Sequence, residues 1–215
     1  METNKPVRMG GPVVVIVNYG MGNLGSILNM VRMFCPQSVV TSDPQIICKA
    51  DKIILPGVGA FDAAISKINQ LGLRAVLEER AFQGHVPFLG ICLGMQIMMD
   101  RSDEGSLGGL GWIPGHVSAF RKLNLNGLRV PHMGWAPVTP VKKDPLLKDY
   151  QEGTRFYFAH SFFVTAENNE DVLMRANHGV SFDAIVGRGN IRGVQFHPEK
   201  SHKFGKWLLL NFLNM

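Results

Sequence analysis

The chain has 215 residues, of which 46% are hydrophobic and 18% charged, proportions typical of a soluble globular protein of one domain. Its net charge of +5 is spread without a basic run, and no apolar stretch approaches the roughly 18 residues of a membrane-spanning helix. Nucleic-acid binding, membrane insertion and a signal peptide are therefore disfavoured, and we expect a cytoplasmic protein. We expect residues 1–12 to form a flexible N-terminal extension and residues 13–215 to form one domain.

Strands and helices alternate in the first half of the chain. Continuous apolar runs predict buried strands at residues 13–17, 37–41, 52–55 and from residue 86. Helical spacing of apolar residues predicts helices at 24–34, where Asn23 is placed to cap, and at 61–77, with an interruption near Gly72. This alternation indicates a doubly wound α/β domain with a mostly parallel sheet, which binds ligands at the carboxyl ends of its strands.

The second half is richer in strands and ends in a helix. Strands are predicted at 117–120, 128–131, 155–164, 172–176, 184–188 and 190–196. Apolar residues at helical spacing from 204 to 212 predict the closing helix. These additional strands extend the α/β domain and show no internal repeat.

A Gly-x-Cys-x-Gly pattern surrounds Cys92, directly after the apolar run at 86–89. The pattern has the logic of a nucleophile elbow, in which a strand ends, the backbone turns sharply between glycines, and a helix begins beneath the exposed nucleophile. The N-terminus of that helix favours thiolate over thiol. A buried cysteine in a tight turn is the alternative interpretation. The other two cysteines, Cys35 and Cys48, fit reduced thiols of a cytosolic enzyme.

A second candidate segment is His-Pro-Glu at 197–199, at the end of the last predicted strand. A histidine placed there can abstract the proton of a thiol, and a carboxylate two residues later can orient the imidazole. Cys92, His197 and Glu199 therefore have the residue types of a catalytic triad. An ordinary His-Pro turn is the alternative for this segment taken alone.

Together with the segments around them, these patterns resemble the class I (triad) glutamine amidotransferases, most closely the glutaminase subunits of imidazole glycerol phosphate synthase. Four sequence motifs carry the closer match: Tyr-Gly-Met-Gly-Asn at 19–23, Leu-Pro-Gly-Val-Gly-Ala-Phe at 55–61, Pro-His-Met-Gly-Trp at 131–135 and His-Pro-Glu-Lys-Ser at 197–201. They span nearly the whole chain in the family's order. The resemblance implies a flavodoxin-like fold and a glutaminase without a cofactor.

The resemblance also implies roles for individual residues. Cys92 is the expected nucleophile, His197 the general base and acid, and Glu199 the residue that orients His197. The expected oxyanion-hole residues are Val58, Gly59 and Leu93. The expected glutamine-binding residues are Gly57, Gln96, Glu104, His160 and Ser161. A (β/α)8 cyclase is the expected partner in a heterodimer, meeting Asn18, Asn23, Trp135, Tyr157 and Lys200.

Two other kinds of site were weighed against this interpretation. Gly20, Gly22 and Gly25 match a dinucleotide fingerprint, with Asp43 near the position of a ribose-binding acid, but a lone match of this kind is a weak signal. The seven histidines include no i, i+4 pair, and no Cys-x-x-Cys occurs, so the spacing of a zinc site is absent. We therefore expect no metal.

Three alternative functions remain open from the sequence. Residues 23–27 and 200–205 resemble a paralogous branch that supplies ammonia for amidination of surface-polysaccharide sugars. A catalytically idle structural or regulatory subunit with the same fold is a second alternative, which the intact Cys92, His197 and Glu199 disfavour. A free-standing cysteine hydrolase such as a γ-glutamyl hydrolase is the third alternative. The motifs that contain the expected interface residues disfavour it.

Overall fold

A computed structural model describes residues 13–125 and 127–215, and the N-terminal extension expected at 1–12 lies outside the described residues. The main sheet has eight strands. Their spatial order is β2 (Val39–Thr41), β1 (Val14–Val17), β3 (Lys52–Gly57), β4 (Phe88–Cys92), β13 (Ile191–Val194), β12 (Ser181–Arg188), β11 (Val172–Asn177) and β8 (Thr139–Pro140). The first five strands are parallel in the flavodoxin-like order 2-1-3-4-5, and β12, β11 and β8 continue the sheet antiparallel. The predicted fold class is confirmed.

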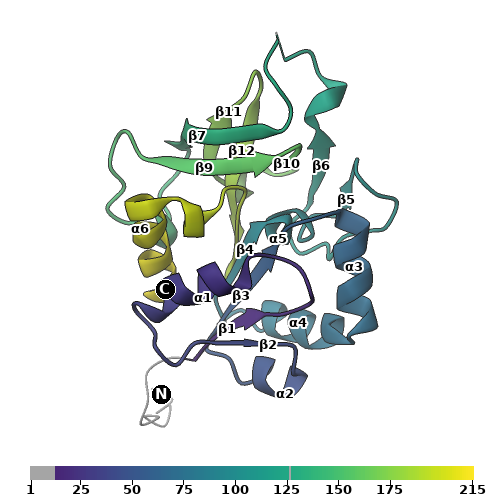
Figure 1. The fold of residues 1–215 in the computed structure, drawn as a ribbon, viewed down its shortest axis with the longest axis vertical. Helices are drawn as coiled ribbons and strands as arrows, with labels where there is room; N and C mark the ends of the chain where they lie inside the picture. Colours follow the sequence, from purple (N-terminus) through teal and green to yellow (C-terminus); the bar gives the residue numbers. More distant parts are fainter. Residues whose placement is uncertain (1–12, 126) are drawn as a thin grey trace.

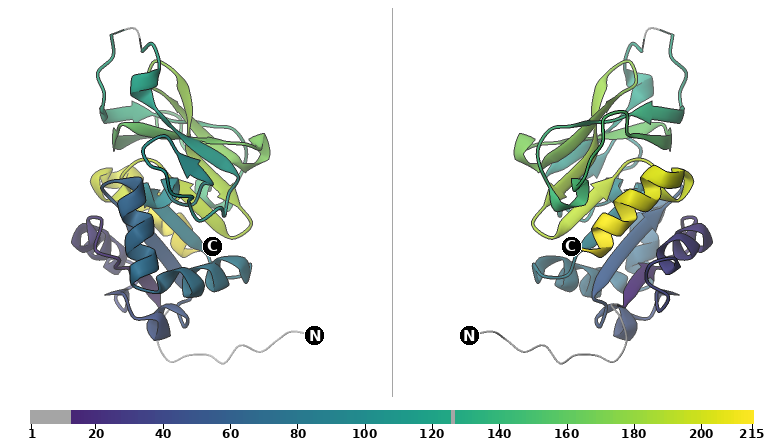
Figure 2. Two further views of the ribbon diagram at one scale, coloured as in Figure 1. Left: turned by 90° about the vertical axis from the view of Figure 1, so that its right-hand side faces the viewer. Right: turned by 90° about the vertical axis from the view of Figure 1, so that its left-hand side faces the viewer.

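Helices cover both faces of the parallel part of the sheet (Figures 1 and 2). One face carries α1 (Leu24–Arg32) and α6 (His202–Leu213). The other carries α2 (Pro44–Ile47), α3 (Phe61–Gln70) and α4 (Leu73–Phe82). Successive strand side chains point to opposite faces, so Val14 and Ile16 join the first core cluster whereas Val15 and Val17 join the second.

Two smaller sheets lie above the carboxyl ends of the parallel strands (Figure 1). One contains β10 (Phe162–Ala166), β6 (Gly115–Ala119) and β5 (Arg101–Ser102), and the other pairs β7 (His132–Pro137) with β9 (Arg155–His160). The remaining elements are α5 (Leu93–Gln96) and the 3₁₀ turns η1 (Phe120–Lys122), η2 (Pro145–Leu147), η3 (Asn169–Asp171) and η4 (Pro198–Lys200). The smaller sheets thus stand over the edge at which a doubly wound fold binds its ligand.

Three local predictions were wrong. Residues 128–131 form no strand, because their apolar side chains at Leu128 and Val130 are exposed in a loop, and the strand begins instead at His132. The single strand predicted at 155–164 is broken at Ser161, and its two parts, β9 and β10, belong to different sheets. Asn23 precedes α1 but makes no side-chain capping hydrogen bond.

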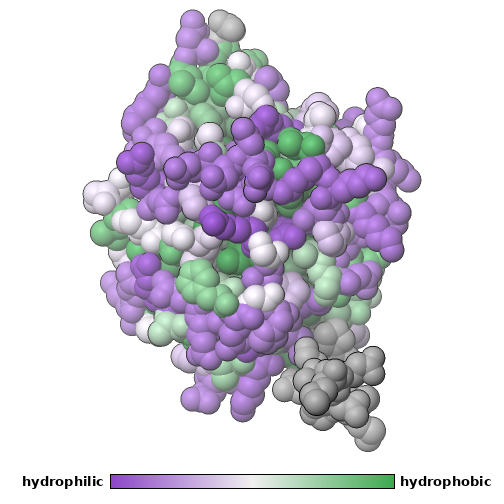
Figure 3. Space-filling view, turned by 180° about the vertical axis from the view of Figure 1, so that it is seen from behind, coloured by the Kyte–Doolittle hydropathy of each residue, from purple (hydrophilic) through white to green (hydrophobic). Residues whose placement is uncertain are grey.

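The view from behind in Figure 3 shows a surface on which polar residues predominate and apolar residues form small separate groups. No helix in residues 13–125 and 127–215 is long and apolar enough to cross a membrane.

Candidate active site

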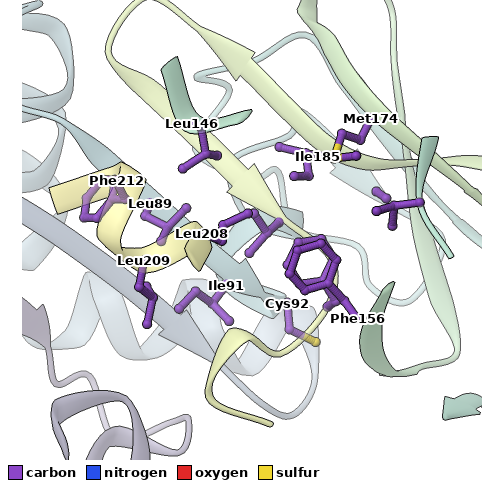
Figure 4. Packing of buried hydrophobic residues seen from close by; sticks show 14 of the residues in the cluster. Leu89, Ile91, Cys92, Leu146, Phe156, Met174, Ile185, Leu208, Leu209 and Phe212 are labelled. Carbon is purple, nitrogen blue, oxygen red and sulfur yellow. The ribbon is translucent and has the colours of Figure 1, made fainter. Parts of the chain in front are cut away.

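Cys92 lies at the tip of β4 in a strained backbone conformation. Its φ of 54° and ψ of −110° are sparsely populated for a residue with a side chain, at a cost of about 1–3 kcal/mol. The surrounding glycines allow this turn to pack. A Cβ on Gly94 would overlap the carbonyl oxygen of Leu55, and one on Gly90 would lie 2.8 Å from the backbone of Gly94. The sequence pattern therefore forms a sharp elbow, with Cys92 at the end of the buried apolar cluster beside Phe156 (Figure 4).

The helix beneath the elbow is shorter than the pattern suggested. α5 has a single turn, Leu93–Gln96, and is followed only by tight turns in which Met98 and Met99 donate to Met95 and Gln96. The macrodipole of one turn is small, because it sums over few aligned peptides. Negative charge on the Cys92 sulfur therefore needs other donors.

His197 reaches the elbow from the neighbouring strand. β13 runs parallel to β4 with Val194 opposite Ile91, so the segment that follows β13 meets the end of β4. The backbone N–H of His197 donates to the carbonyl oxygen of Tyr157 at 2.9 Å, and Ser201 Oγ donates to the His197 carbonyl oxygen at 2.7 Å. These bonds fix the backbone that carries the imidazole.

The His197 ring lies between an acid and the thiol. Its Nδ1 is 2.9 Å from Oε1 of Glu199, whose side chain is only 1% exposed. Burial lowers the pKa of His197, but hydrogen bonds with Cys92 and Glu199 and their negative charges outweigh burial and raise the pKa to about 10. The arrangement therefore favours an imidazolium held between the Glu199 carboxylate and the Cys92 sulfur.

A cavity of about 200 Å³ opens above Cys92 and His197. Its lining contains most of the predicted site residues, namely Val58, Gly59, Leu93, Gln96, Glu104, His160 and Ser161. Pro131, Met133, Ala159 and Phe162 complete the wall, and sequence reasoning had not assigned them to the site. A larger recess of about 590 Å³, against β5, β6 and β10, has no cysteine in its lining.

The segment predicted to form part of the oxyanion hole follows β3. β3 pairs with β4 so that Gly57 lies opposite Cys92, and Val58 and Gly59 continue into the cavity wall. The buried Tyr19 hydroxyl donates to the Pro56 carbonyl oxygen at 2.6 Å, and a Cβ on Gly57 would lie 2.6 Å from that hydroxyl oxygen. Burial and the nearby Cys92 raise the pKa of Tyr19. Glycine is thus required at position 57 because a side chain would collide with Tyr19. Glycine is required at position 59 because a φ of 127° is strained for residues with a side chain.

Glu104 enters the cavity from the loop after β5. Its Oε2 accepts a hydrogen bond of 2.9 Å from the backbone N–H of Phe61, the first residue of α3. Asp62 in the same turn accepts from the backbone N–H groups of Ser106 and Leu107, which lowers its pKa. Hydrogen bonds in both directions therefore join the loop to the start of α3, and they fix the position of the Glu104 carboxylate at the cavity wall.

The turn between β9 and β10 places two side-chain donors around one carbonyl oxygen. Phe162 O accepts from Gln96 Nε2 at 3.1 Å and from His160 Nδ1 at 2.7 Å. His160 Nε2 lies 3.0 Å from His132 Nδ1. Burial lowers the pKa of His160 to about 3 and that of His132 to about 4, so both rings are neutral and His132 donates to His160. The break at Ser161, which the sequence did not indicate, is what brings this network to the cavity.

Residues 15–214 match the family described as "Glutamine amidotransferase class-I". The chain belongs to this family. A relative from Bdellovibrio bacteriovorus, "Imidazole glycerol phosphate synthase subunit HisH", is 47% identical over 93% of this chain and 98% of its own. "Imidazole glycerol phosphate synthase subunit HisH 2" of Pseudomonas aeruginosa is 41% identical over 94% and 100%. A solved glutamine amidotransferase shares the fold, with a TM-score of 0.71 at 16% identity over 95% of this chain and 100% of that chain.

In this amidotransferase, the residues expected at a partner interface form two groups. Trp135 pairs with Tyr157 across β7 and β9 and stacks on His202 at 5.6 Å, and the Lys200 ammonium lies 5.8 Å from the Tyr157 ring centre. Asn18 accepts a hydrogen bond from the backbone N–H of Gly20 at the end of β1, and Asn23 is exposed before α1. α1 contacts η4, which carries Lys200.

The residues of the dinucleotide fingerprint have structural uses in the amidotransferase fold. Gly22 packs against Pro56, and Asp43 caps α2 by accepting from the backbone N–H of Gln45. Among the described residues, no group of three His, Cys, Asp or Glu side chains is placed to hold a metal ion.

Sequence reasoning missed Tyr19, His132 and Gln195 as residues of the site. Tyr19 and His132 lie within the sequence motifs at 19–23 and 131–135, but the sequence assigned no role to either residue. Gln195 stands two residues before His197, fully buried, and its side chain lies against Cys92. A glutamine in an otherwise apolar run that ends at the candidate base is the signal that could have identified it.

Proposed function

We propose that this chain is the glutaminase subunit of imidazole glycerol phosphate synthase and hydrolyses L-glutamine to glutamate and ammonia. The observation that carries the proposal is the strained Cys92 elbow facing the buried His197–Glu199 pair at the floor of a cavity of about 200 Å³. The full-length similarity to relatives that bear this subunit's name supports the same function.

The proposed reaction passes through a thioester. The Cys92 thiolate attacks the side-chain amide carbon of glutamine, and the protonated His197 gives its proton to the leaving nitrogen, which departs as ammonia. Water then attacks the γ-glutamyl thioester, its proton passes to His197, and the sulfur leaves as thiolate with glutamate. Glu199 holds the ring in one tautomer and offsets its charge throughout.

The proposed oxyanion hole consists of backbone N–H groups at Leu93 and at Val58 or Gly59. Such donors are typically worth about 10²–10³ in rate each. The position of residues 57–59 opposite the elbow supports this assignment, because a carbonyl carbon bonded to the sulfur has its oxygen near that segment.

The cavity wall suits a small amino acid. Its volume of about 200 Å³ is below the range of roughly 300–1,000 Å³ usual for drug-sized ligands. Glu104 offers a carboxylate to the substrate ammonium, and His160, Ser161 and Gln96 form the polar part of the wall beside the rest of the amino-acid end. We assign Gly57 to the same site for its position beside the elbow.

The ammonia product indicates a partner subunit. Free ammonia is mostly protonated at neutral pH and is then a poor nucleophile, so it is useful only when delivered directly to a second active site. We propose a (β/α)8 cyclase in a heterodimer, docked over Trp135, Tyr157 and Lys200 on one side and Asn18 and Asn23 on the other. The exposed aromatic side chain of Trp135 supports this assignment, since aromatic residues are enriched at interfaces.

A glutamine-mimicking electrophile tests the assignment of the nucleophile. A chloroketone analogue of glutamine should modify Cys92 in the complex and spare Cys35 and Cys48, with excess glutamine protecting the thiol. Modification of Cys35 or Cys48 in place of Cys92, located by peptide mass spectrometry, would show that the nucleophile is misassigned.

The surface-polysaccharide branch is the second candidate. It rests on residues 23–27 and 200–205, which lie on elements that contact each other at the proposed interface, where partner choice is determined. Complementation separates the two. The proposed function requires that the gene, supplied with its neighbouring cyclase-like gene, restores growth without histidine to a strain lacking this glutaminase. Restoration of surface polysaccharide alone would favour the branch.

A further inference from the structure

Gln195 is a buried polar residue that the proposed mechanism does not use. It follows β13, its backbone N–H donates to the Ala184 carbonyl oxygen at 2.9 Å, and its side chain has no exposure to solvent. A buried carboxamide needs partners for both its oxygen and its nitrogen, since an unpaired polar group costs free energy. Its two partners are Gln96 and Cys92.

The direction of the Gln195 amide is fixed by a backbone carbonyl. Phe162 O can only accept, so the Gln96 atom 3.1 Å away from it must be the donor Nε2. That nitrogen also donates to the Gln195 side chain at 3.2 Å, which must therefore present its oxygen there. The remaining end, the Gln195 Nε2 donor, then faces the Cys92 sulfur at 3.8 Å.

A hydrogen-bond donor at this position can stabilise negative charge on the buried Cys92 sulfur. Cys92 is 7% exposed, so a thiolate there loses most of its contact with water. The single turn of α5 provides only a small dipole, and the imidazolium of His197 gives up a proton in every cycle. A fixed amide N–H remains on the sulfur through the whole reaction, and it favours the thiolate both before attack and when the thioester is hydrolysed.

We propose that Gln195 is a catalytic residue that donates an N–H to the Cys92 sulfur, and that Phe162 O and Gln96 hold it in that orientation. This inference deepens the proposed function and rests on Cys92 being the nucleophile. The carboxamide takes no part in bond making. It is a fixed hydrogen-bond donor to the atom on which negative charge appears.

The pH dependence of Cys92 alkylation by iodoacetamide tests the proposal without glutamine turnover. Gln195→Leu removes the donor, and Gln195→Glu replaces the donating NH₂ with an oxygen at nearly unchanged shape. Both variants should move the midpoint of the Cys92 rate profile up by about one pH unit, which is about tenfold in rate on the acidic side. Cys48 in the same sample should keep its profile, and faster labelling of buried Cys35 would reveal unfolding.

A second measurement uses the unaltered protein, so a misfolded variant does not block the test. The side-chain NH₂ resonances of ¹⁵N-labelled Gln195 should titrate with the midpoint of Cys92 alkylation and should shift when Cys92 is alkylated. Unchanged Cys92 midpoints in folded variants, or Gln195 resonances insensitive to both pH and alkylation, would overturn the proposal. A complex that fails to hydrolyse glutamine while the midpoint still moves would instead contradict only the proposed function.

Discussion

At the scale of single residues, the site contains a buried positive charge on His197, and neighbouring side chains stabilise that charge. His197 is kept protonated by contacts on two sides, with the Glu199 carboxylate on Nδ1 and the Cys92 sulfur on the cavity side. Within residues 13–125 and 127–215 the Glu199 Oε2 atom has no hydrogen-bond partner, whereas Oε1 lies 2.9 Å from the ring nitrogen Nδ1. The imidazolium and the Glu199 carboxylate stabilise each other where either alone would be expensive to bury.

Replacement of Cys92 by Ala should separate the two halves of the proposed reaction. Glutamine-dependent synthesis by the assembled complex should fall to background, because the sulfur is needed to release ammonia. Synthesis from added ammonium salt should be retained, since the second active site is untouched. Both rates are measured with the same complex, and loss of the ammonium-dependent rate in a correctly assembled complex would contradict the assigned role.

The histidines behind the cavity predict a pH dependence of stability. The pKa values of His132, about 4, and His160, about 3, lie below the reference value of 6.5. Between these values the unfolded state binds more protons, so their contribution is complete above pH 6.5 and is lost as the pH falls towards 3. His197 has the opposite sign, since its contribution is present below pH 6.5 and is lost as the pH rises towards 10.

His132→Phe isolates the acidic part of this dependence. The phenyl ring can keep the stacking of His132 on Phe158 and His178, but it does not titrate. Urea unfolding at pH 6.5 and pH 4 should show a smaller loss of unfolding free energy in the variant than in the unaltered chain. Equal losses in both proteins would show that His132 does not contribute.

At the scale of elements, the elbow depends on the close packing of α5 against β3 and β4. Gly94→Ala should lower the free energy of unfolding by about 1–3 kcal/mol or more, because the added methyl group overlaps the Leu55 carbonyl oxygen. Gly25→Ala is the matched control, since Gly25 lies in α1 with open space around its Cβ position, and its stability should be unchanged or slightly higher. Denaturant titration measures both, and equal effects would contradict the packing argument.

Sequence patterns predicted the strands and helices of the parallel part of the fold well, and those of the smaller sheets less well. β1, β3 and the division between α3 and α4 near Gly72 follow from apolar runs and helical spacing. Leu128 and Val130 look like strand residues locally, but they lie exposed in a loop, and β7 begins after Pro131 in a segment with Gly134 at φ of 129°. Its pairing with β9 is a contact between distant segments, which local patterns do not encode.

The same distinction applies to the site. Cys92, His197 and Glu199 could be proposed from the sequence because each belongs to a short motif with chemical meaning. Gln195 and Tyr19 were missed because their importance lies in the direction of a side-chain hydrogen bond across the fold, to Cys92 and to Pro56. The glutamine in the apolar run at 191–196 marks a buried polar group, but the sequence does not show which side chain across the fold it contacts.

At the scale of the whole molecule, the cavity opens near the exposed aromatic group of β7 and β9. Met133 lines the cavity, and Trp135 two residues later on the same strand is 43% exposed. A partner that covers Trp135 therefore also approaches the cavity mouth, which connects binding with activity.

Trp135→Ala should weaken binding of the proposed cyclase subunit at least tenfold, because a large exposed aromatic residue at an interface is a common hot spot. Phe82→Ala is the matched control, since Phe82 is 66% exposed on α4, which packs on the other face of the sheet. Isothermal titration calorimetry measures both affinities. An unchanged affinity for Trp135→Ala, or an equal loss for Phe82→Ala, would remove this surface from the proposed interface.

The glutaminase rate of the purified chain, measured with and without the proposed cyclase subunit, tests the central claim most directly. The proposed function predicts a low rate for the chain alone and a strong increase when the partner and its ligand are added. A full rate without the partner would indicate a free-standing hydrolase, and no hydrolysis in either state would indicate an idle subunit. Either of those results would contradict the account.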